Sequence, residues 1–276
     1  MKIATWNVNS IRARIENFLQ WAREEQPDVV LLQEIRCTNE QFPYLAFDDL
    51  GYNIEVLGEK SRNGVAIFSK YKMYDVVKEL PLYGIVDEDG SSRYLEASID
   101  YKGKVVKVAS IYVPNGGPSV IDVKNDVKDY TTTQNFNFKM KFDDRLNRRF
   151  KESMDNGEIA LFGGDYNVCP NLYMDVYSTD KDGSITCTEQ ERQKFEAFIE
   201  SGMVDAWRSR NKELKDYTWW GYRPYYMWEK NYGYRLDAIM ATPDADKFIT
   251  DCYICRDVRS QEKASDHVPM VCEIEF

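Results

Sequence analysis

The chain of 276 residues has 30% charged residues, a formal net charge of −10 at pH 7 and a sequence pI near 4.9. This acidic balance excludes a protein whose whole surface is a basic footprint for nucleic acid. The sequence has no apolar run of membrane-spanning length, its six cysteines are scattered, and we expect no secretory leader because the first residues read as a strand. We therefore expect a cytoplasmic protein, without a membrane partner, in a reducing compartment.

The first two predicted strands each end in a polar residue. Residues 1–7 form an apolar strand that ends in Asn7, before an amphipathic helix predicted over residues 11–25. Residues 28–34 are a β-branched and apolar run, typical of a strand buried on both faces, and this run ends in Glu34. Both side chains are therefore expected at the edge of a sheet, where loops carry functional groups.

The middle of the chain predicts an antiparallel pair of strands over residues 93–100 and 104–112, joined by a short turn. The pair indicates a mixed sheet rather than a purely parallel one. Tyr112 ends the second strand, and Asn115 follows in a segment whose proline and glycines stop strand pairing.

The next strand leads to a carboxylate and an amide. Residues 158–164 are apolar and end in two glycines, which permit a tight turn before Asp165 and Asn167. Helices are expected on either side of this strand, over residues 135–154 and 189–201.

The C-terminal quarter contains the only histidine of the chain. Residues 234–241 read as a strand with Asp237 inside it, where a charge is costly unless it is paired. Asp266 and His267 then form a short polar loop before a strand over residues 268–274. An ordinary surface turn is the alternative for this pair alone, but the acidic and amide residues at other strand ends favour a functional site.

Six motifs thus stand in order along the chain: Trp6-Asn7-Val8-Asn9, Leu32-Gln33-Glu34, Ile111-Tyr112-Val113-Pro114-Asn115, Gly164-Asp165-Tyr166-Asn167, Gly233-Tyr234-Arg235-Leu236-Asp237 and Ser265-Asp266-His267. In this combination the sequence resembles the exonuclease III family of apurinic/apyrimidinic endonucleases, within the endonuclease/exonuclease/phosphatase superfamily, and its form is nearest to bacterial members. Periodicity alone predicts an α/β protein with layered sheets. The resemblance implies an α/β four-layer sandwich of two mixed β-sheets packed face to face with flanking helices, and an active site at one end. No linker or repeat divides the chain, so we expect a single catalytic domain over residues 1–276.

The carboxylates predict a metal site and a group that activates water. Glu34 and Asp266 are hard oxygen donors, which suit Mg²⁺ or Mn²⁺ better than Zn²⁺, and one histidine cannot build a three-histidine zinc site. We expect Mg²⁺, which Mn²⁺ can replace, on these carboxylates and Asn7, where it neutralises phosphate charge. Asp165 is the candidate to orient or deprotonate the attacking water, with Asn167 and Asn7 holding this carboxylate or the phosphate oxygens by amide hydrogen bonds.

Other polar residues are candidates for phosphate contacts. His267 is expected to contact a non-bridging phosphate oxygen, while Asp237 bonds to its other ring nitrogen and fixes the tautomer. Tyr112 is expected to donate to the phosphate or the leaving oxygen, although a tyrosine that merely ends a strand is the alternative. Arg36 and Asn115 are candidate substrate contacts, and for Arg36 a solvent-exposed charge is the alternative.

Two segments reverse the acidic average of the chain. Residues 134–154 have six Lys or Arg against three acids, and residues 208–235 have seven against three, whereas acids gather at 87–89 and 122–129. A DNA duplex could contact these two basic segments, while the acidic surplus lies elsewhere on the protein. A solvated helix face explains the first segment equally well, because its phenylalanines recur every four residues and leave the charges on the opposite side.

Nine aromatic residues lie between residues 217 and 234, interleaved with Gly, Pro and cations in a loop-like composition. Exposed aromatic rings beside cations can stack on bases or line a pocket for an extrahelical sugar. The resemblance implies that Trp219, Tyr234 and Leu236 form the pocket for the abasic site. Tyr234 stands where several well-known members have Trp, which leaves the size of the pocket open, and an aromatic cluster under a loop is the alternative for the neighbouring rings.

Our hypothesis from the sequence is a Mg²⁺-dependent DNA repair phosphodiesterase that acts as a monomer. It cleaves 5′ to abasic sites in double-stranded DNA to leave a 3′-hydroxyl, with associated 3′–5′ exonuclease and 3′-end trimming implied by the resemblance. The alternatives are a superfamily phosphoesterase acting on inositol or lipid phosphates, and a non-catalytic nucleic-acid-binding module. The first has no evident need for the aromatic segment, and the second has no need for the metal and Asp-His set.

Overall fold

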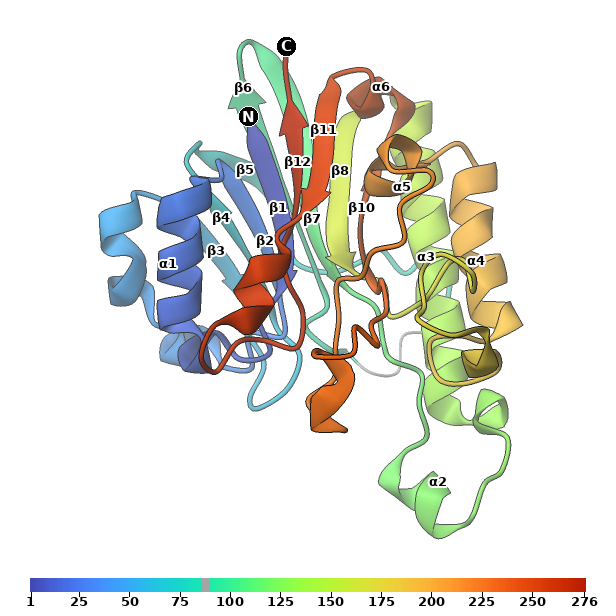
Figure 1. Ribbon diagram of the computed structural model, residues 1–276. Coiled ribbons are helices and arrows are strands. Elements are labelled where there is room, and N and C mark those ends of the chain that lie inside the picture. Colours follow the sequence, from blue (N-terminus) through green and yellow to red (C-terminus); the bar gives the residue numbers. More distant parts are fainter. Residues whose placement is uncertain (86–89) are drawn as a thin grey trace.

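The computed structural model describes residues 1–85 and 90–276, so the acidic run expected at 87–89 lies outside the described residues. Within these residues two six-stranded sheets are present (Figure 1). In spatial order, the first sheet contains β11 (Ile249–Ile254), β12 (Met270–Ile274), β1 (Lys2–Asn7), β2 (Val29–Gln33), β4 (Val65–Ser69) and β3 (Asn53–Leu57). The second contains β5 (Met73–Val77), β6 (Tyr94–Tyr101), β7 (Lys104–Tyr112), β8 (Ile159–Asp165), β10 (Asp237–Ala241) and β9 (Val204–Asp205).

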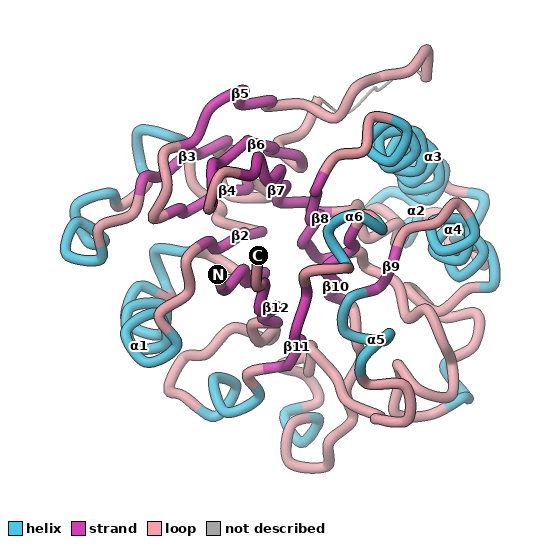
Figure 2. The backbone as a smooth tube through the Cα atoms, turned by 90° about the horizontal axis from the view of Figure 1, so that it is seen from above, coloured by secondary structure: helices cyan, strands magenta, loops and turns pink. Residues whose placement is uncertain are grey.

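Both sheets are mixed. The neighbours β1 and β2 are parallel, as are β7 and β8, and the other pairs are antiparallel. Figure 2 shows helices on both outer sides of the two sheets. These helices are α1 (Ile15–Glu25), α2 (Val120–Lys124), α3 (Gln134–Asp155), α4 (Glu189–Glu200), α5 (Ala206–Arg210) and α6 (Pro243–Asp246). The expected α/β four-layer sandwich of two mixed sheets is confirmed.

The alternation of side chains along each strand divides the core into layers. Ile3, Leu31 and Val108 belong to the apolar layer between the two sheets, together with Leu161. Because successive side chains in a strand point to opposite faces, the next residues along β1 and β8 face the helices instead. On β1, Ile3, Thr5 and Asn7 therefore lie on the same face of the strand. This face is directed towards the second sheet, and Asn7 stands at its end.

Aromatic side chains fill the two outer layers. Phe18 of α1 lies within 6.3 Å of Trp6 on β1, and a second cluster joins Phe150 of α3 to Phe162 of β8 and Phe198 of α4, with ring centroids 4.8 and 5.1 Å apart. Large buried rings of this kind contribute much of the apolar burial in a core. They hold both sheets against their helices and so fix the strand ends relative to one another.

Two predicted boundaries were wrong by three residues or more. The helix predicted over residues 11–25 begins at Ile15, because Ser10 has a left-handed φ of 86° and Ile11–Ala13 form a separate 3-10 turn. The strand predicted from residue 234 begins at Asp237, which places this carboxylate at the start of the strand rather than inside it. Both differences lie near strand ends, where polar loops replace regular pairing.

The interpretation of α3 as a helix with one charged, solvated face holds for only half of its cations, since Lys141, Arg148 and Lys151 are exposed. Lys139, Arg145 and Arg149 are buried. Lys139 pairs with Glu191 of α4 at 2.6 Å, and Arg149 pairs with Glu96 of β6 at 2.9 Å. Arg145 donates to the main-chain carbonyls of Leu80 and Pro81. The helix therefore packs on more than one side, and its buried cations bind groups from elements distant in sequence.

The close packing of the two sheets at Gly163 generates a stability prediction. A Cβ at this position would lie 2.7 Å from Leu31 Cδ1 and 3.1 Å from Thr5 Cβ, both on the facing sheet. We expect Gly163→Ala to lower the free energy of unfolding by about 1–3 kcal/mol, because the sheets cannot separate without losing other contacts. Chemical denaturation measures this change.

Leu31→Val supplies the matched test, because valine lacks the Cδ1 atom that the new methyl group would meet. The double variant is expected to lose less stability than the sum of the two single variants. Additive losses would show that the two sheets are not in close contact at this point.

Candidate active site

Strand ends of both sheets meet at one edge of the sandwich. In the second sheet Tyr112, Asp165 and Asp237 are direct neighbours across β7, β8 and β10, so their side chains share one face. In the first sheet Asn7 is the neighbour of Gln33 across β1 and β2. All five residues face the space between the sheets, so the sequence brings polar groups together where the apolar layer ends.

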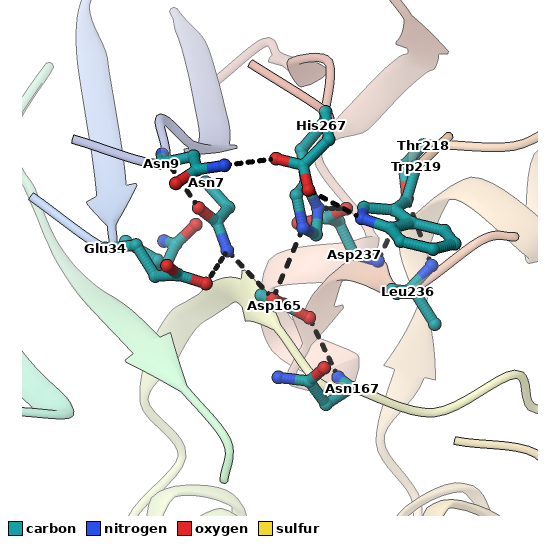
Figure 3. Close-up of polar contacts among 12 residues, drawn as sticks. Asn7, Asn9, Glu34, Asp165, Asn167, Thr218, Trp219, Leu236, Asp237 and His267 are labelled. Carbon is teal, nitrogen blue, oxygen red and sulfur yellow. Dashed lines mark hydrogen bonds and ion pairs between the residues drawn. The ribbon is translucent and has the colours of Figure 1, made fainter. Parts of the chain in front are cut away.

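Asn7 connects the two sheets. Its Nδ2 donates to Glu34 Oε1 at 3.0 Å and to Asp165 Oδ2 at 2.9 Å, as Figure 3 shows. Its Oδ1 accepts the main-chain N–H of Asn9 at 3.0 Å, and its carbonyl accepts Ser265 Oγ at 2.7 Å. Asn7 is fully buried, so these bonds fix the amide and place two carboxylates from different sheets within two hydrogen bonds of each other.

Glu34 is held from three directions. Oε1 also accepts the Tyr112 hydroxyl at 2.7 Å, and Oε2 accepts Arg36 Nε at 2.8 Å and its Nη2. The backbone turns at this point, because Glu34 and Arg36 both have left-handed φ values, 51° and 53°. Burial, together with the nearby Glu34 carboxylate, raises the pKa of Tyr112 well above its ordinary value, so the hydroxyl remains a donor.

Asp266 lies on the opposite side of Asn7. Its Oδ1 accepts Asn9 Nδ2 at 2.8 Å, and its Oδ2 accepts Trp219 Nε1 at 3.0 Å. The chain of bonds from Glu34 through Asn7 and Asn9 to Asp266 is thus continuous, and it joins the three residues that the sequence suggested as metal ligands.

His267 stands between two carboxylates. Its Nδ1 is 2.8 Å from Asp237 Oδ2, and its Nε2 is 3.7 Å from Asp165 Oδ2. Burial disfavours the imidazolium, but the charges of Asp237 and Asp165 outweigh this cost and raise the pKa of His267 to about 10. The ring therefore carries a proton on both nitrogens at neutral pH, and its orientation is set by Asp237.

Asp165 is almost completely buried, with an exposed fraction of 1%. Burial is the largest cause that raises its pKa, to about 7, while His267 and the Asn7 hydrogen bond oppose the increase. Its Oδ1 accepts the main-chain N–H of Asn167 at 2.9 Å. A carboxylate with a pKa near neutrality can accept a proton at physiological pH, which suits a general base.

Asn167 and Asn115 come from adjacent loops and contact each other. Asn115 Nδ2 donates to Asn167 Oδ1 at 3.2 Å, and Asn167 Nδ2 donates to the Val113 carbonyl at 2.9 Å. Asn167 has a left-handed φ of 50°, which Asn tolerates better than most residues. The turn after β8 is therefore tied to the loop after β7.

The three residues suggested for the abasic pocket lie together beside His267. The Trp219 and Tyr234 rings are 5.2 Å apart in an edge contact, and the Trp219 and His267 rings are 6.5 Å apart. Leu236 packs in the same apolar cluster, with an exposed fraction of 6%. Tyr234 also contacts Tyr177 at 5.7 Å, so its ring is held on two sides.

The chemistry of the donor atoms fits a divalent metal ion. Asp165, Asp237 and His267 lie close together, with one candidate ligand atom of each within 4.8 Å of the others. The doubly protonated His267 ring has no free lone pair, however, so the carboxylates are the metal-binding groups of this cluster. Across the described residues, Asp237 Oδ1 is buried with no hydrogen-bond partner, which leaves an acceptor for a cation or a water molecule. Glu34 and Asp266 add carboxylates on the other side of Asn7. Oxygen-rich donors of this kind suit Mg²⁺ or Mn²⁺.

A model of the Endonuclease/Exonuclease/phosphatase family matches residues 4–267, which includes the residues of this site. The chain belongs to this family. Its curated relatives include exodeoxyribonuclease III of Haemophilus influenzae, 28% identical with 99% of both chains covered, and an exodeoxyribonuclease of Bacillus subtilis, 27% identical with 98% of both covered.

Solved structures of the Endonuclease/Exonuclease/phosphatase family agree over the full length. An AP endonuclease from Archaeoglobus fulgidus has a TM-score of 0.86 and 33% identity, with 100% of both chains covered. A 3′ phosphatase from Neisseria bound to a product DNA hairpin has a TM-score of 0.87 and 28% identity, also with 100% of both covered. These similarities confirm the sequence-based expectation of a hydrolytic, metal-dependent DNA repair nuclease.

Sequence reasoning missed several residues that shape the site. Asn9 binds Asp266, and Thr218 Oγ1 accepts the N–H groups of Leu236 and Asp237 at 3.0 and 3.1 Å. Arg93 lies over the Tyr112 ring, 4.8 Å from its centroid. The position of Asn9 two residues after Asn7 was a usable signal, whereas Arg93 has no local motif and reaches the site only through strand pairing.

The position of His267 predicts an unusual titration. Because its folded-state pKa is raised above the ordinary 6.5, its contribution to stability is fully present below pH 6.5 and is lost as pH rises towards 10. As the only histidine, it gives a single set of imidazole NMR signals. We expect these signals in the metal-free protein to remain those of the imidazolium at pH 8, and Asp237→Asn to lower the titration midpoint. A wild-type midpoint near 6.5 would contradict the ion pair.

Proposed function

We propose that this protein is a Mg²⁺-dependent phosphodiesterase that cleaves double-stranded DNA on the 5′ side of abasic sites and leaves a 3′-hydroxyl. The same centre would trim blocked 3′ ends and remove nucleotides in the 3′–5′ direction. One observation carries the proposal: Asn7 bonds to both Glu34 and Asp165, and Asp165 lies beside the His267–Asp237 pair. This arrangement supports the proposal because it brings groups suited to activating water and to binding phosphate into one cluster.

In the proposed reaction, Asp165 orients a water molecule and accepts its proton during in-line attack on phosphorus. Its raised pKa supports this role, because a base near neutrality combines a useful ionised fraction with proton affinity. Asn7 and the main-chain N–H of Asn167 hold the two oxygens of this carboxylate, so it is oriented before substrate binds.

The cationic His267 ring would donate from Nε2 to a non-bridging phosphate oxygen, where negative charge develops. Asp237 keeps the ring in place through Nδ1, and buried donors fixed in this way stabilise a transition state strongly. Tyr112 would move its hydroxyl from Glu34 towards the phosphate or the leaving oxygen. Its raised pKa keeps the proton on the oxygen throughout.

The proposed metal ligands are Glu34, Asp266 and Asn7, with Mg²⁺ as the resident ion and Mn²⁺ as a substitute. A bound divalent ion would neutralise phosphate charge at this end of the site. Arg36 occupies Glu34 Oε2 and would then be available for a DNA phosphate.

A groove of about 930 Å³ beside the site is the proposed path of the DNA strand. Among the described residues that line it are Arg62, Arg93, Asn115 and Lys141, and none of the lining residues in 1–85 and 90–276 is acidic. Phosphate contacts of this kind supply most of the affinity in DNA binding and make it depend on salt. The proposed pocket for the extrahelical sugar, formed by Trp219, Tyr234 and Leu236, lies beside His267.

We further propose that residues 1–276 act as one catalytic domain and as a monomer in the cytoplasm, where the DNA substrate is found. None of the helices in residues 1–85 and 90–276 combines the length and apolar character of a membrane span.

Three substrates test the proposal: a duplex with one tetrahydrofuran abasic analogue, an intact duplex and an inositol phosphate, each with Mg²⁺ or EDTA. We expect incision of the first substrate with Mg²⁺ and none with EDTA. Asp165→Asn and His267→Ala should each lower kcat by roughly 10²–10⁴-fold, because each removes a group that acts in the transition state.

Asp155→Asn is the matched control, since it makes the same chemical change at an exposed residue at the end of α3. Its activity should equal that of the wild type. Preferential hydrolysis of the inositol phosphate would instead support a phosphoesterase of small phosphorylated molecules, and metal-independent binding without cleavage would support a nucleic-acid-binding module.

A further inference from the structure

Lys139 is a buried cation that the proposed mechanism does not use. It lies in α3 with an exposed fraction of 0%, and its Nζ donates to Glu191 Oε1 of α4 at 2.6 Å and to the main-chain carbonyl of Asn167. Glu191 is buried equally well, and its Oε2 accepts the N–H and hydroxyl of Thr188 in the capping box of α4. The ion pair therefore joins α3, the start of α4 and the turn after β8.

A buried ion pair such as Lys139–Glu191 is not expected to add much to the stability of the fold. Moving two charges out of water costs several kcal/mol per ion, and apolar residues of similar volume often replace such pairs without loss of stability. Asp143 adds a third ionisable group, and burial raises its pKa to about 7 against the opposing charge of Lys139. What the pair does provide is a donor at a fixed point, aimed at one main-chain carbonyl.

That carbonyl belongs to the residue that orients Asp165. The Asn167 N–H binds Asp165 Oδ1, while its side chain binds Asn115 and the Val113 carbonyl. Because Asn167 has a left-handed φ, its peptide groups point in directions that regular strand pairing cannot satisfy. Lys139 satisfies the carbonyl and so holds the turn in this conformation.

The stem of Lys139 also supports the neighbouring loop. A Cβ on Gly116 would lie 2.8 Å from Lys139 Cδ and 3.5 Å from its Cβ, and Gly116 has a left-handed φ of 77°. The backbone next to Asn115 thus rests directly on the methylene groups of the lysine. One side chain consequently contacts both loops that carry the Asn115–Asn167 pair.

We propose that Lys139, fixed by Glu191, is a positioning residue that sets the Asn167 turn and the Asn115 loop in the geometry that orients Asp165. The inference rests on the proposed phosphodiesterase function. It states that a residue outside the active site holds the catalytic groups in position. Lys139 touches neither the water nor the phosphate in this account. Because the Asn115 loop also lines the proposed DNA groove, removal of Lys139 should lower kcat by a larger factor than it raises KM.

The decisive variant is Lys139→Met/Glu191→Gln. It removes one charge of each sign beside Asp143 rather than leaving Lys139 or Glu191 unpaired, and glutamine preserves the capping box of α4, so the melting temperature should stay close to that of the wild type. We expect kcat for the tetrahydrofuran duplex to fall about 10–100-fold, because small misplacements of reacting groups have effects of this size. Wild-type kcat in a folded double variant overturns the proposal.

Two further variants separate the donor from the charge. Glu191→Gln alone keeps the lysine donor and the capping box, and its kcat should stay well above that of the double variant; an equal loss in both overturns the proposal. Lys151→Met makes the same lysine change at an exposed position of α3 and should have no effect. If the double variant does not fold, Lys139→Arg replaces it, since arginine keeps the charge but changes the reach to the Asn167 carbonyl; unchanged kcat then overturns the proposal.

Hydrogen exchange makes the inference independent of the substrate. Failure of the wild type to incise the abasic duplex would refute the proposed function but not the positioning role. In that case, peptides that contain residues 113–117 and 165–168 should take up deuterium faster in the double variant than in the wild type, with the strands unchanged. Equal uptake in both proteins overturns the positioning role.

Discussion

The site depends on one buried amide that bonds to carboxylates from two sheets. Asn7 Nδ2 donates to Glu34 and to Asp165, at 3.0 and 2.9 Å. Two carboxylates so close together would repel each other in water, and a shared neutral donor lets both remain near without a permanent charge between them. A cation with oxygen ligands is then the natural addition, because it offsets their charge. The apolar layer between the sheets fixes the positions of the strand ends. The hydrogen bonds of Asn7 then hold Glu34 and Asp165 close together, which forms the site.

Charge is distributed unevenly around this amide. On one side Glu34 pairs with Arg36, and on the other the cationic His267 lies between Asp237 and Asp165. Burial raises the pKa of Asp165 to about 7, and the surrounding acids raise that of His267 to about 10, so a base and a cation coexist within a few ångströms at neutral pH. That combination suits a phosphodiester, which needs both an activated water and a stabilised oxyanion. The groove that we propose for DNA is lined by cations such as Arg62, Arg93 and Lys141, which reconciles the net charge of −10 with the proposed nucleic-acid substrate.

Much of this arrangement could be predicted from the sequence because the relevant signals are local. Asn7 and Asp165 each end an apolar strand, and the alternation of side chains places both on the face between the sheets. Glu34 follows its strand and reaches the same site through the turn at its left-handed φ. The buried cations of α3 could not be predicted, because the partner of Lys139 lies 52 positions further along the chain and sequence spacing gives no sign that α4 covers this face. The start of the first helix was predicted wrongly for a related reason. Residues 11–14 have helical spacing, but the main-chain N–H of Ile11 donates to the Ile35 carbonyl, and residues 11–13 form a separate 3-10 turn.

The central claim is that strand ends from two sheets form a single cation-binding pocket around Asn7. Crystals soaked in Mn²⁺ and measured at the manganese absorption edge test it directly, because anomalous scattering locates the ion without assumptions about its ligands. The account predicts an anomalous peak within coordinating distance of the Glu34 carboxylate, in the pocket that also contains Asp165 and His267. A peak only outside this pocket, or none at millimolar Mn²⁺, would contradict it.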